Sequence, residues 1–366
     1  MTKRILYIAE MPAYHCAYEI GGFINAGYEV VVLSAWKNQD IFDDFKVNSP
    51  IYFLHTNLRG SLFLKFLPPV YILLLLFNRT FRRIKRDYSI DVIYTSWSSN
   101  VLLAGLFAKM LFKKPWIHRY LMYPMSLDDN KNFFERIVFN SVQSSITKLI
   151  VHTKQMKSLL VNQGYSKEKI FVNWEKFPIS FFGDNQVRYN YVSEDKRPSL
   201  VFLGNLGGAE QNDISKLVKS LEAFVTIWVM DTRENRQLLS KYSNVMFFYA
   251  KPVGPVLTRY IQGFDGVLAC YNDDYASRCR LNTVVPNRVT LGIPAKIPFV
   301  IPRTQLSGSK ELLGSLNLLV EFDEPAEIPE LLVISHRLLR KRPIELANIH
   351  LNKEEVESLI NLSFEK

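Results

Sequence analysis

The chain has 366 residues, 48% of them hydrophobic and 22% charged, so it has the length for two domains of ~150–180 residues and enough apolar residues for their cores. This composition excludes an intrinsically disordered or collagen-like protein. Three widely separated cysteines, Cys16, Cys270 and Cys279, argue against a disulfide framework and favour a reducing compartment. No CxxC or HxxxH spacing occurs, so we expect no metal site.

A net charge of +10 calls for an anionic partner, which could be nucleic acid, phosphate groups or a membrane surface. The opening residues, MTKRILYIAEM, lack the long apolar segment and cleavage site of a signal peptide, so we interpret them as a first β-strand and expect a cytoplasmic protein. No recognised DNA- or RNA-binding module is present, so we expect no nucleic-acid partner.

In the first half of the chain, short apolar runs alternate with helical patterns, as is typical of parallel α/β units. The predicted strands are Ile5–Ala9, Glu29–Leu33, Ile51–Leu54, Asp91–Thr95, Trp116–Tyr120, Leu149–His152 and Ile170–Asn173. The predicted helices between them are Tyr14–Ala26, Pro69–Arg86, Val101–Leu111, Asn132–Ser144 and Lys154–Asn162. Residues 183–197 are polar and without periodicity, which predicts a linker.

A second alternating series follows the linker. Its predicted strands are Leu200–Leu203, Thr226–Met230, Val245–Phe248, Gly266–Ala269, Phe299–Ile301 and Leu318–Val320. The fold class is therefore α/β, with two Rossmann-like doubly wound domains at residues 1–182 and 198–342 and an interdomain cleft at the carboxyl ends of both sheets. We predict that residues 343–366 form one amphipathic helix that packs back on the first domain through Leu351, Val356 and Leu359.

The segment Phe66–Phe77 is apolar without interruption and is followed by a cluster of basic residues. Twelve residues are too few to span a bilayer, which needs ~20. One interpretation is a buried core helix with a solvated basic end; the other is an interfacial helix whose arginines contact anionic headgroups. On the second interpretation the membrane-surface residues are Arg79, Arg82, Arg83 and Arg86.

Two common nucleotide-binding motifs are missing. The first strand is not followed by GxGxxG, and no GxxxxGK[ST] occurs, so we expect neither a dinucleotide-dependent dehydrogenase nor a P-loop kinase.

Several segments, in chain order, resemble motifs of GT-B glycosyltransferases of the family 4 type found in bacterial polysaccharide biosynthesis. They are AGYEVVVLS at 26–34, DVIYTSW at 91–97, the strand–helix–strand segment 149–178, PSLVFLGNLGG at 198–208 and VPNRVTLGIPAKIPFVI at 285–301. The resemblance implies a GT-B fold with a nucleotide-sugar donor bound by the second domain. The chain departs from the family at Thr283 and Leu291, which stand where two acids of the donor site are usual.

The resemblance also implies which residues bind the donor. A diphosphate leaving group needs backbone N–H groups and a cation, without an obligatory metal or other cofactor. The glycine turn after the first strand of the second domain and the segment around Arg288 are the expected places. The donor-binding candidates are Gly204, Asn205, Gly207, Asn287, Arg288, Arg280 and Asn272.

Direct displacement by an acceptor hydroxyl needs a general base from the first domain. The candidates are Asp129, Asp128 and His118, in and after the strand Trp116–Tyr120. For Asp129 the alternative is a helix N-cap, and for His118 a buried core histidine. His15 and Arg119 are expected on the acceptor side.

The leading hypothesis is a glycosyltransferase that acts on a lipid-linked or oligosaccharide acceptor in the assembly of capsule, exopolysaccharide or lipopolysaccharide. It would work at the inner face of the cytoplasmic membrane as a peripheral protein on an anionic surface. One alternative is a non-catalytic scaffold of the same fold, which the two missing acids suggest. The other is a nucleotide-sugar epimerase.

Overall fold

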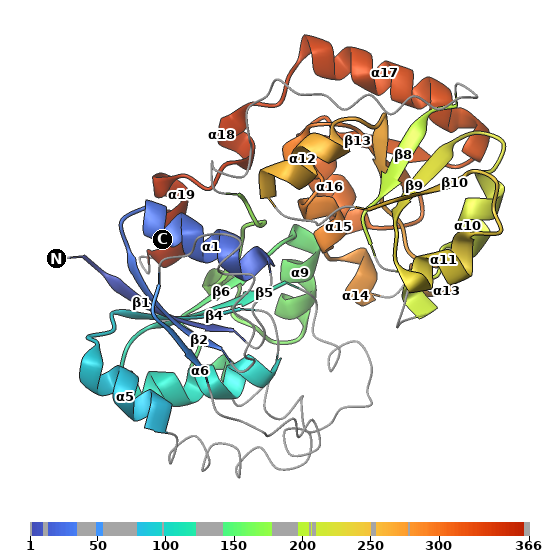
Figure 1. The fold of residues 1–366 in the computed structure, drawn as a ribbon. Helices are drawn as coiled ribbons and strands as arrows, with labels where there is room; N and C mark the ends of the chain where they lie inside the picture. Colours follow the sequence, from blue (N-terminus) through green and yellow to red (C-terminus); the bar gives the residue numbers. More distant parts are fainter. Residues whose placement is uncertain are drawn as a thin grey trace. The chain divides into compact units, whose positions relative to one another are not determined.

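The computed structural model describes residues 2–9, 14–34, 49–53, 79–96, 99–121, 142–177, 197–204, 206, 210–249, 254–276 and 279–361. The chain divides into two compact units, the first made of Met1–Pro178 with Leu351–Lys366 and the second of Ile179–His350. Each unit is built on one parallel sheet with helices packed on it (Figure 1). The α/β class with two doubly wound sheets is confirmed.

The first unit has a seven-stranded sheet in the order β3-β2-β1-β4-β5-β6-β7. The strands are β1 (Arg4–Ala9), β2 (Glu29–Ser34), β3 (Ile51–Phe53), β4 (Val92–Ser96), β5 (Trp116–Tyr120), β6 (Lys148–Val151) and β7 (Ile170–Val172). All seven predicted strands are confirmed, with small shifts at their ends. They are predicted well from sequence because β1, β4, β5 and β6 are buried on both faces and so consist largely of apolar and aromatic residues.

Helices cover both faces of this sheet. On one face, α1 (Tyr14–Asn25) and the C-terminal α19 (Lys353–Ile360) share a core with Tyr7 of β1 and Tyr94 of β4. On the other face, α6 (Ser99–Phe112) approaches β5 so closely that a Cβ on Gly105 would meet the Trp116 ring. The remaining elements are α5 (Arg79–Asp87), α9 (Lys154–Asn162) and the 3₁₀ turn η1 (Lys167–Lys169).

The second unit has a six-stranded sheet in the order β10-β9-β8-β11-β12-β13. Its strands are β8 (Ser199–Phe202), β9 (Thr226–Met230), β10 (Val245–Phe248), β11 (Gly266–Leu268), β12 (Phe299–Pro302) and β13 (Leu319–Phe322), and all were predicted. Its helices are η3 (Glu210–Asn212), α10 (Ser215–Ser220), α11 (Arg233–Leu239), α12 (Gly254–Ile261), α13 (Asp273–Ala276), α14 (Cys279–Asn282), α15 (Asn287–Thr290), η4 (Ile293–Ala295), α16 (Ser307–Ser315), η5 (Pro325–Glu327), α17 (Ile328–Lys341) and α18 (Leu346–Ile349).

The single C-terminal helix predicted over 343–366 is wrong. The segment holds two short helices, α18 and α19, separated by extended backbone at Asn352. The Asn352 side chain accepts a hydrogen bond from the backbone N–H of Glu355 and so starts α19 as an N-cap. Before it, the N–H of Leu351 donates to the carbonyl of Phe177, which holds the chain extended there.

The segment from Leu351 onward belongs to the first unit, whereas α18 belongs to the second. Leu351 fills the space over Gly22 of α1, where a Cβ would overlap the leucine side chain. Val356 and Leu359 are buried in the same core. At the other end of α19, the Lys148 ammonium donates to the carbonyls of Ser358 (2.5 Å) and Asn361 (3.0 Å).

Candidate functional site

Both sheets have the strand order that creates a topological switch point. In the first sheet β1 lies between β2 and β4, and in the second β8 lies between β9 and β11. Ligands of open α/β sheets bind outside the carboxyl ends of the strands at such a point. The chain segments that follow β8 and β11, and those that follow β1, β4 and β5, are therefore the places where a site is expected.

In the second unit, Arg288 lies at the carboxyl ends of β8 and β11. Its guanidinium donates to the carbonyl of Cys270 (2.5 Å) and to the side-chain oxygen of Asn212 (3.1 Å). The rings of Phe202 and Tyr271 lie 4.8 and 4.4 Å from its central carbon. Two aromatic contacts and two hydrogen bonds fix the planar head group in place.

The turn after β8 packs closely on Phe202 and lies beside this arginine. A Cβ on Gly204 would lie 2.9 Å from the Phe202 ring and 3.7 Å from the central carbon of Arg288, so the absence of a side chain makes the close packing possible. Buried Asn235 accepts from the N–H of Leu206 (3.0 Å) and donates to the carbonyl of Gly204 (3.4 Å). The Asn235 side chain of α11 therefore fixes the backbone on both sides of the turn.

Polar side chains brace the neighbouring segments. Asn272 donates to the carbonyl of Glu210 (3.1 Å), which joins the segment after β11 to the turn that carries Asn212. Gln305 accepts from the N–H of Tyr271 (2.7 Å) and donates to its carbonyl (3.1 Å). These contacts hold Tyr271 in the position from which it covers Arg288.

The charge of Arg288 has no acidic partner among the residues that the structure describes. Arg288 is 8% exposed, and its partners are a carbonyl, an amide and two rings, all of them neutral. The adjacent Cys270 is a thiol, because burial raises its pKa to about 12. A buried cation surrounded by neutral groups attracts an anion, and a guanidinium suits phosphate oxygens.

The first unit contains a buried network near the carboxyl ends of β1, β4 and β5. Arg119 makes an ion pair with Glu19 (2.8 Å), and it also donates to the hydroxyl of Tyr94 (2.9 Å) and to Asn173 (3.3 Å). The hydroxyls of Tyr7 and Tyr94 both donate to Glu19. The network therefore satisfies both charges and ties α1 to three strands.

Electrostatics reinforce this network. Burial alone would lower the pKa of Arg119, but the Glu19 carboxylate and Tyr94 outweigh it and the pKa is raised. Burial raises the pKa of both tyrosines, with a further contribution from Glu19. Arg119 is thus charged and both phenols are neutral, and each hydrogen bond in the network has a defined donor.

Glu175, which follows β7, is a second acid beside this network. It is 6% exposed, and its pKa is raised to about 8 by burial and then by repulsion from Glu19, with Arg119 acting in the opposite direction. Glu175 is therefore largely protonated at neutral pH.

The network extends to the C-terminal helix. The Asn173 amide that contacts Arg119 also donates to Glu355 of α19 (3.4 Å), and Lys176 makes an ion pair with the same carboxylate. Glu355 in the first turn of α19 is thus linked to the buried Arg119 through Asn173.

Of the predicted catalytic candidates, His118 does not have the surroundings expected of a general base. It is fully buried in β5, and burial lowers its pKa to about 3. Its Nδ1 lies 2.7 Å from the hydroxyl of Thr95, and Trp116 donates to that hydroxyl. The alternative of a core histidine describes this environment, so we do not retain His118 as a base. Arg119, expected on the acceptor side, is in the buried network.

Other predicted residues lie outside the described part of the chain. Those for which nothing is described are Asp128, Asp129, Asn205 and Gly207, and the side chains of His15 in α1 and Arg280 in α14 are also not described. Of the donor candidates, the structure brings Gly204 and Arg288 together, with Asn272 next to Tyr271 in the chain. Asn287 is exposed at the start of α15.

The basic residues Arg79, Arg82, Arg83 and Arg86 all lie exposed on α5, whose apolar residues Phe81 and Ile84 are buried. The segment Phe66–Phe77 lies outside the described residues, so its burial is not tested. Among the helices that the structure describes, none combines the length and apolarity that a bilayer crossing needs. Within the same ranges, no cluster of His, Cys, Asp and Glu side chains could hold a metal ion.

The sequence interpretation missed several residues that build these two places. They are Phe202, Asn212, Asn235, Tyr271 and Gln305 in the second unit and Glu19, Tyr7, Tyr94 and Glu175 in the first. A partial signal was available, because Phe202 lies in the predicted strand Leu200–Leu203 and Tyr271 comes two residues after the predicted strand Gly266–Ala269.

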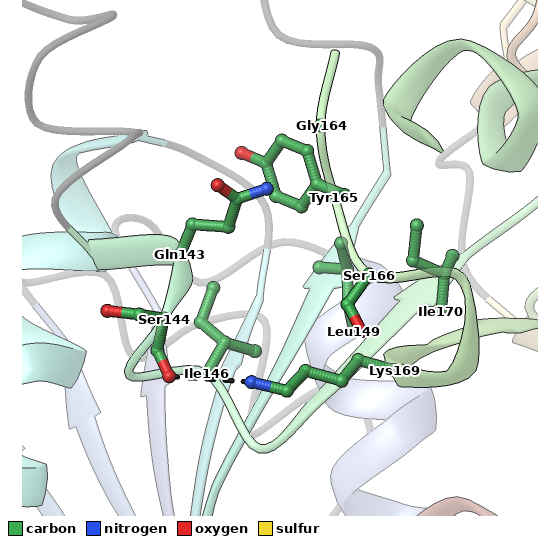
Figure 2. Close-up of a pocket in the computed structure, with 9 residues that line it drawn as sticks. All are labelled: Gln143, Ser144, Ile146, Leu149, Gly164, Tyr165, Ser166, Lys169 and Ile170. Atoms are coloured by element: carbon green, nitrogen blue, oxygen red, sulfur yellow. Dashed lines mark hydrogen bonds between the residues drawn. The ribbon is translucent and has the colours of Figure 1, made fainter. Parts of the chain in front are cut away.

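A pocket of 210 Å³ lies elsewhere in the first unit, lined by Gln143, Tyr165, Lys169 and their neighbours (Figure 2). Its apolar residues Leu149 and Ile170 stand at the amino-terminal ends of β6 and β7, and Lys169 donates to the carbonyl of Ser144 (3.5 Å). This is the opposite end of the sheet from the switch point, so we separate the pocket from the candidate site.

No protein-family model and no curated protein sequence matches the chain. Solved structures do match, over nearly its whole length. HepE from Anabaena, crystallised with UDP-glucose, aligns at a TM-score of 0.60 and 11% identity, covering 98% of this chain and 96% of HepE. The lipopolysaccharide outer core galactosyltransferase WaaB aligns at 0.58 and 14%, covering 98% of each chain.

The UDP-GlcNAc 2-epimerase of Methanocaldococcus jannaschii is similar to the same degree, with a TM-score of 0.59, 14% identity and 98% of each chain covered. At these identities the likeness shows the fold. The GT-B fold expected from the sequence is therefore confirmed, and it is shared by glycosyltransferases and by nucleotide-sugar epimerases.

Proposed function

We propose that the chain is a glycosyltransferase that takes a sugar from a nucleoside diphosphate sugar bound by the second unit. The observation that carries this proposal is the charge of Arg288, which is fixed beside the Gly204 turn with neutral partners. Transfer releases a nucleoside diphosphate, and a preorganised guanidinium stabilises the negative charge that develops on it. HepE was crystallised with UDP-glucose, so uridine donors are the first to test.

In this proposal the first unit supplies the acceptor side. Asp128 and Asp129 stay the candidates for the base that accepts the proton of the acceptor hydroxyl, and His15 stays a candidate for acceptor contact. Arg288 and backbone N–H groups neutralise the diphosphate in place of a metal ion. Donor binding and transfer are then expected to survive EDTA, and a loss of activity that Mg²⁺ restores would contradict this part.

We further propose that the acceptor is lipid-linked or a glycan, in cell-surface polysaccharide assembly at the inner face of the cytoplasmic membrane. The net charge of +10 and the exposed arginines of α5 support an anionic surface as partner. Changing Arg79, Arg82, Arg83 and Arg86 to Gln is expected to weaken binding to anionic vesicles without changing the binding of soluble donors.

The first experiment is a thermal-shift panel of uridine, guanosine, thymidine and cytidine diphosphate sugars together with cytidine monophosphate sugars. A ligand that binds only the folded chain stabilises it by RT ln(1 + [L]/Kd). A donor identified this way is then used with lipid extracts as acceptors. If no member of the panel changes the melting temperature, the proposed donor class is wrong.

The similarity to a UDP-GlcNAc 2-epimerase favours an epimerase as the second candidate. An epimerase converts its nucleotide sugar without an acceptor, whereas a transferase accumulates a glycosylated acceptor and free nucleotide. Incubation of the bound donor alone, followed by NMR of the sugar, separates the two. A donor that binds but is neither converted nor transferred to any lipid extract would indicate the non-catalytic scaffold.

A further inference from the structure

Helix α17 of the second unit has one face in the core and another that is open to solvent. Ile328, Leu332 and Ser335 are buried, and the helix lies beside β13. On the outward side, Val333, Ile334 and Leu338 are 50, 45 and 52% exposed. Large aliphatic side chains that are half exposed and lie together on one helix face form an apolar patch of the kind that marks an interaction surface.

The same face is basic toward its C-terminal end. Val333, Ile334, Arg337, Leu338 and Lys341 recur at the spacing of one helical stripe. Beside the stripe, Arg340 and Arg342 are also exposed. None of these four basic side chains makes an ion pair with a carboxylate that the structure describes.

We propose that this outward stripe of α17 binds the surface of an anionic lipid bilayer. Val333, Ile334 and Leu338 would enter the boundary between headgroups and acyl chains, and the basic residues would contact lipid phosphates. An interfacial helix needs this combination of exposed aliphatic side chains and flanking Lys and Arg. The basic side chains favour an anionic surface as the partner, and the exposed aliphatic side chains favour one with an apolar interior, which is a lipid bilayer.

A single-stranded nucleic acid would use aromatic side chains for stacking, and the stripe has none. Helix α5 is also basic, but its apolar residues Phe81 and Ile84 are buried, so among the described residues α17 combines both parts of an interfacial surface and α5 only one. The assignment rests on α17 alone and does not depend on the proposed transferase activity.

The test uses the full chain and flotation with two kinds of vesicle, phosphatidylcholine alone and phosphatidylcholine mixed with phosphatidylglycerol. Wild type is expected to bind the mixed vesicles and not the neutral ones. Each basic residue near an anionic surface contributes about fivefold to binding, so the double variant Arg337→Gln/Lys341→Gln is expected to bind about 25-fold more weakly. The matched control Lys219→Gln/Lys241→Gln makes the same charge change elsewhere on the second unit.

The apolar part has its own variant. Ile334→Ser/Leu338→Ser is expected to lower vesicle binding at least about tenfold, because buried methylene groups are lost from the acyl boundary. Met246→Ser, at an exposed apolar residue of β10, serves as the control. A Leu338→Cys variant labelled with an environment-sensitive fluorophore is expected to shift to shorter wavelength with the mixed vesicles only.

The proposal is overturned if the α17 variants bind mixed vesicles as tightly as their controls, or if the label at 338 does not respond. It is also overturned if the chain binds an RNA homopolymer with the same dependence on Arg337 and Lys341 and ignores lipid. Soluble-donor binding measured on the same variants separates this proposal from the proposed function, because α17 has no contact with Arg288 among the described interactions.

Discussion

Among the described residues each unit holds one buried arginine, near the carboxyl ends of its sheet, and the two arginines differ in what neutralises them. Arg119 is 2% exposed and has the Glu19 carboxylate at 2.8 Å, with two tyrosines completing the network. Arg288 is nearly as buried, but its described partners are neutral. The first charge is therefore used within the fold, whereas the second is available for an anionic ligand.

The contrast separates stability from function. Removing one member of a compensated buried pair leaves the other charge buried without a partner, and the cost falls on folding. Removing a cation whose partners in the fold are neutral lowers the free energy of unfolding less, and the larger loss is in the affinity for the anionic ligand. A substitution in the Arg119 network is therefore expected to lower mainly the stability of the chain, and a substitution of Arg288 to lower mainly the affinity for the ligand.

The largest effect is expected for Glu19→Gln. This change leaves the Arg119 charge buried with neutral groups and replaces one of the two oxygens that accept the tyrosine hydroxyls with an amide NH2, so the free energy of unfolding is expected to fall by about 3–5 kcal/mol. Urea unfolding followed by circular dichroism measures it.

The matched control is Glu29→Gln, which removes a partly exposed pair with Arg4 and is expected to cost less than about 1 kcal/mol. Equal losses in the two variants would mean that the buried network adds nothing beyond an ordinary surface pair.

Glu175 is expected to make the stability of the first unit depend on pH. Its pKa rises from the ordinary 4.5 to about 8 on folding, first through burial and then through Glu19. The folded chain then holds a proton that the unfolded chain releases, so this contribution is complete below pH 4.5 and is lost as pH rises toward about 8. The loss approaches about 1.4 kcal/mol per pH unit in that window.

Glu175→Gln removes this titration and isolates it from all other groups. The difference in free energy of unfolding between the variant and wild type is expected to grow in favour of the variant from pH 5 to pH 8. A difference that is the same at both pH values would show that Glu175 does not hold its proton in the fold.

Arg288 is the counterpart in the second unit. Arg288→Ala is expected to weaken donor binding by about 1.5–3 kcal/mol, the scale of a charged hydrogen bond, as measured by titration calorimetry with the donor found in the panel. Arg340→Ala, at an exposed arginine of the same unit, is the control and is expected to bind normally. An unchanged donor affinity in Arg288→Ala would remove this residue from the site and take away the main support for the proposed function.

Much of the fold could be predicted because the strands are short, mostly apolar runs, of which Thr226–Met230 and Val245–Phe248 matched to the residue. The pairing of Glu19 with Arg119 could not be predicted, because the two residues are far apart in sequence and meet only when α1 packs on the sheet. The burial of His118 could have been predicted from the sequence. It is two residues from Trp116 and from Tyr120, so all three lie on the same face of β5.

Arg288 was identified through the resemblance, but its environment was not. Local patterns do not show that a residue ending β8 and another following β11 will stack on the same guanidinium. The break in the C-terminal segment has a similar origin. It depends on Leu351 docking over Gly22, a contact between the two ends of the chain, while the local pattern of 343–366 is compatible with a continuous helix.

The smallest effect is expected for the cap that follows this break. Asn352→Ala removes the hydrogen bond from the N–H of Glu355 and is expected to cost about 1 kcal/mol of unfolding free energy. Because Glu355 contacts Asn173 and Lys176 beside the buried network, the loss belongs to the first unit, and donor binding by the second unit should not change. Asn352→Asp keeps an acceptor at the cap and is expected to restore stability. If Asn352→Ala instead weakened donor binding as much as Arg288→Ala, the division of roles between the two units would be wrong.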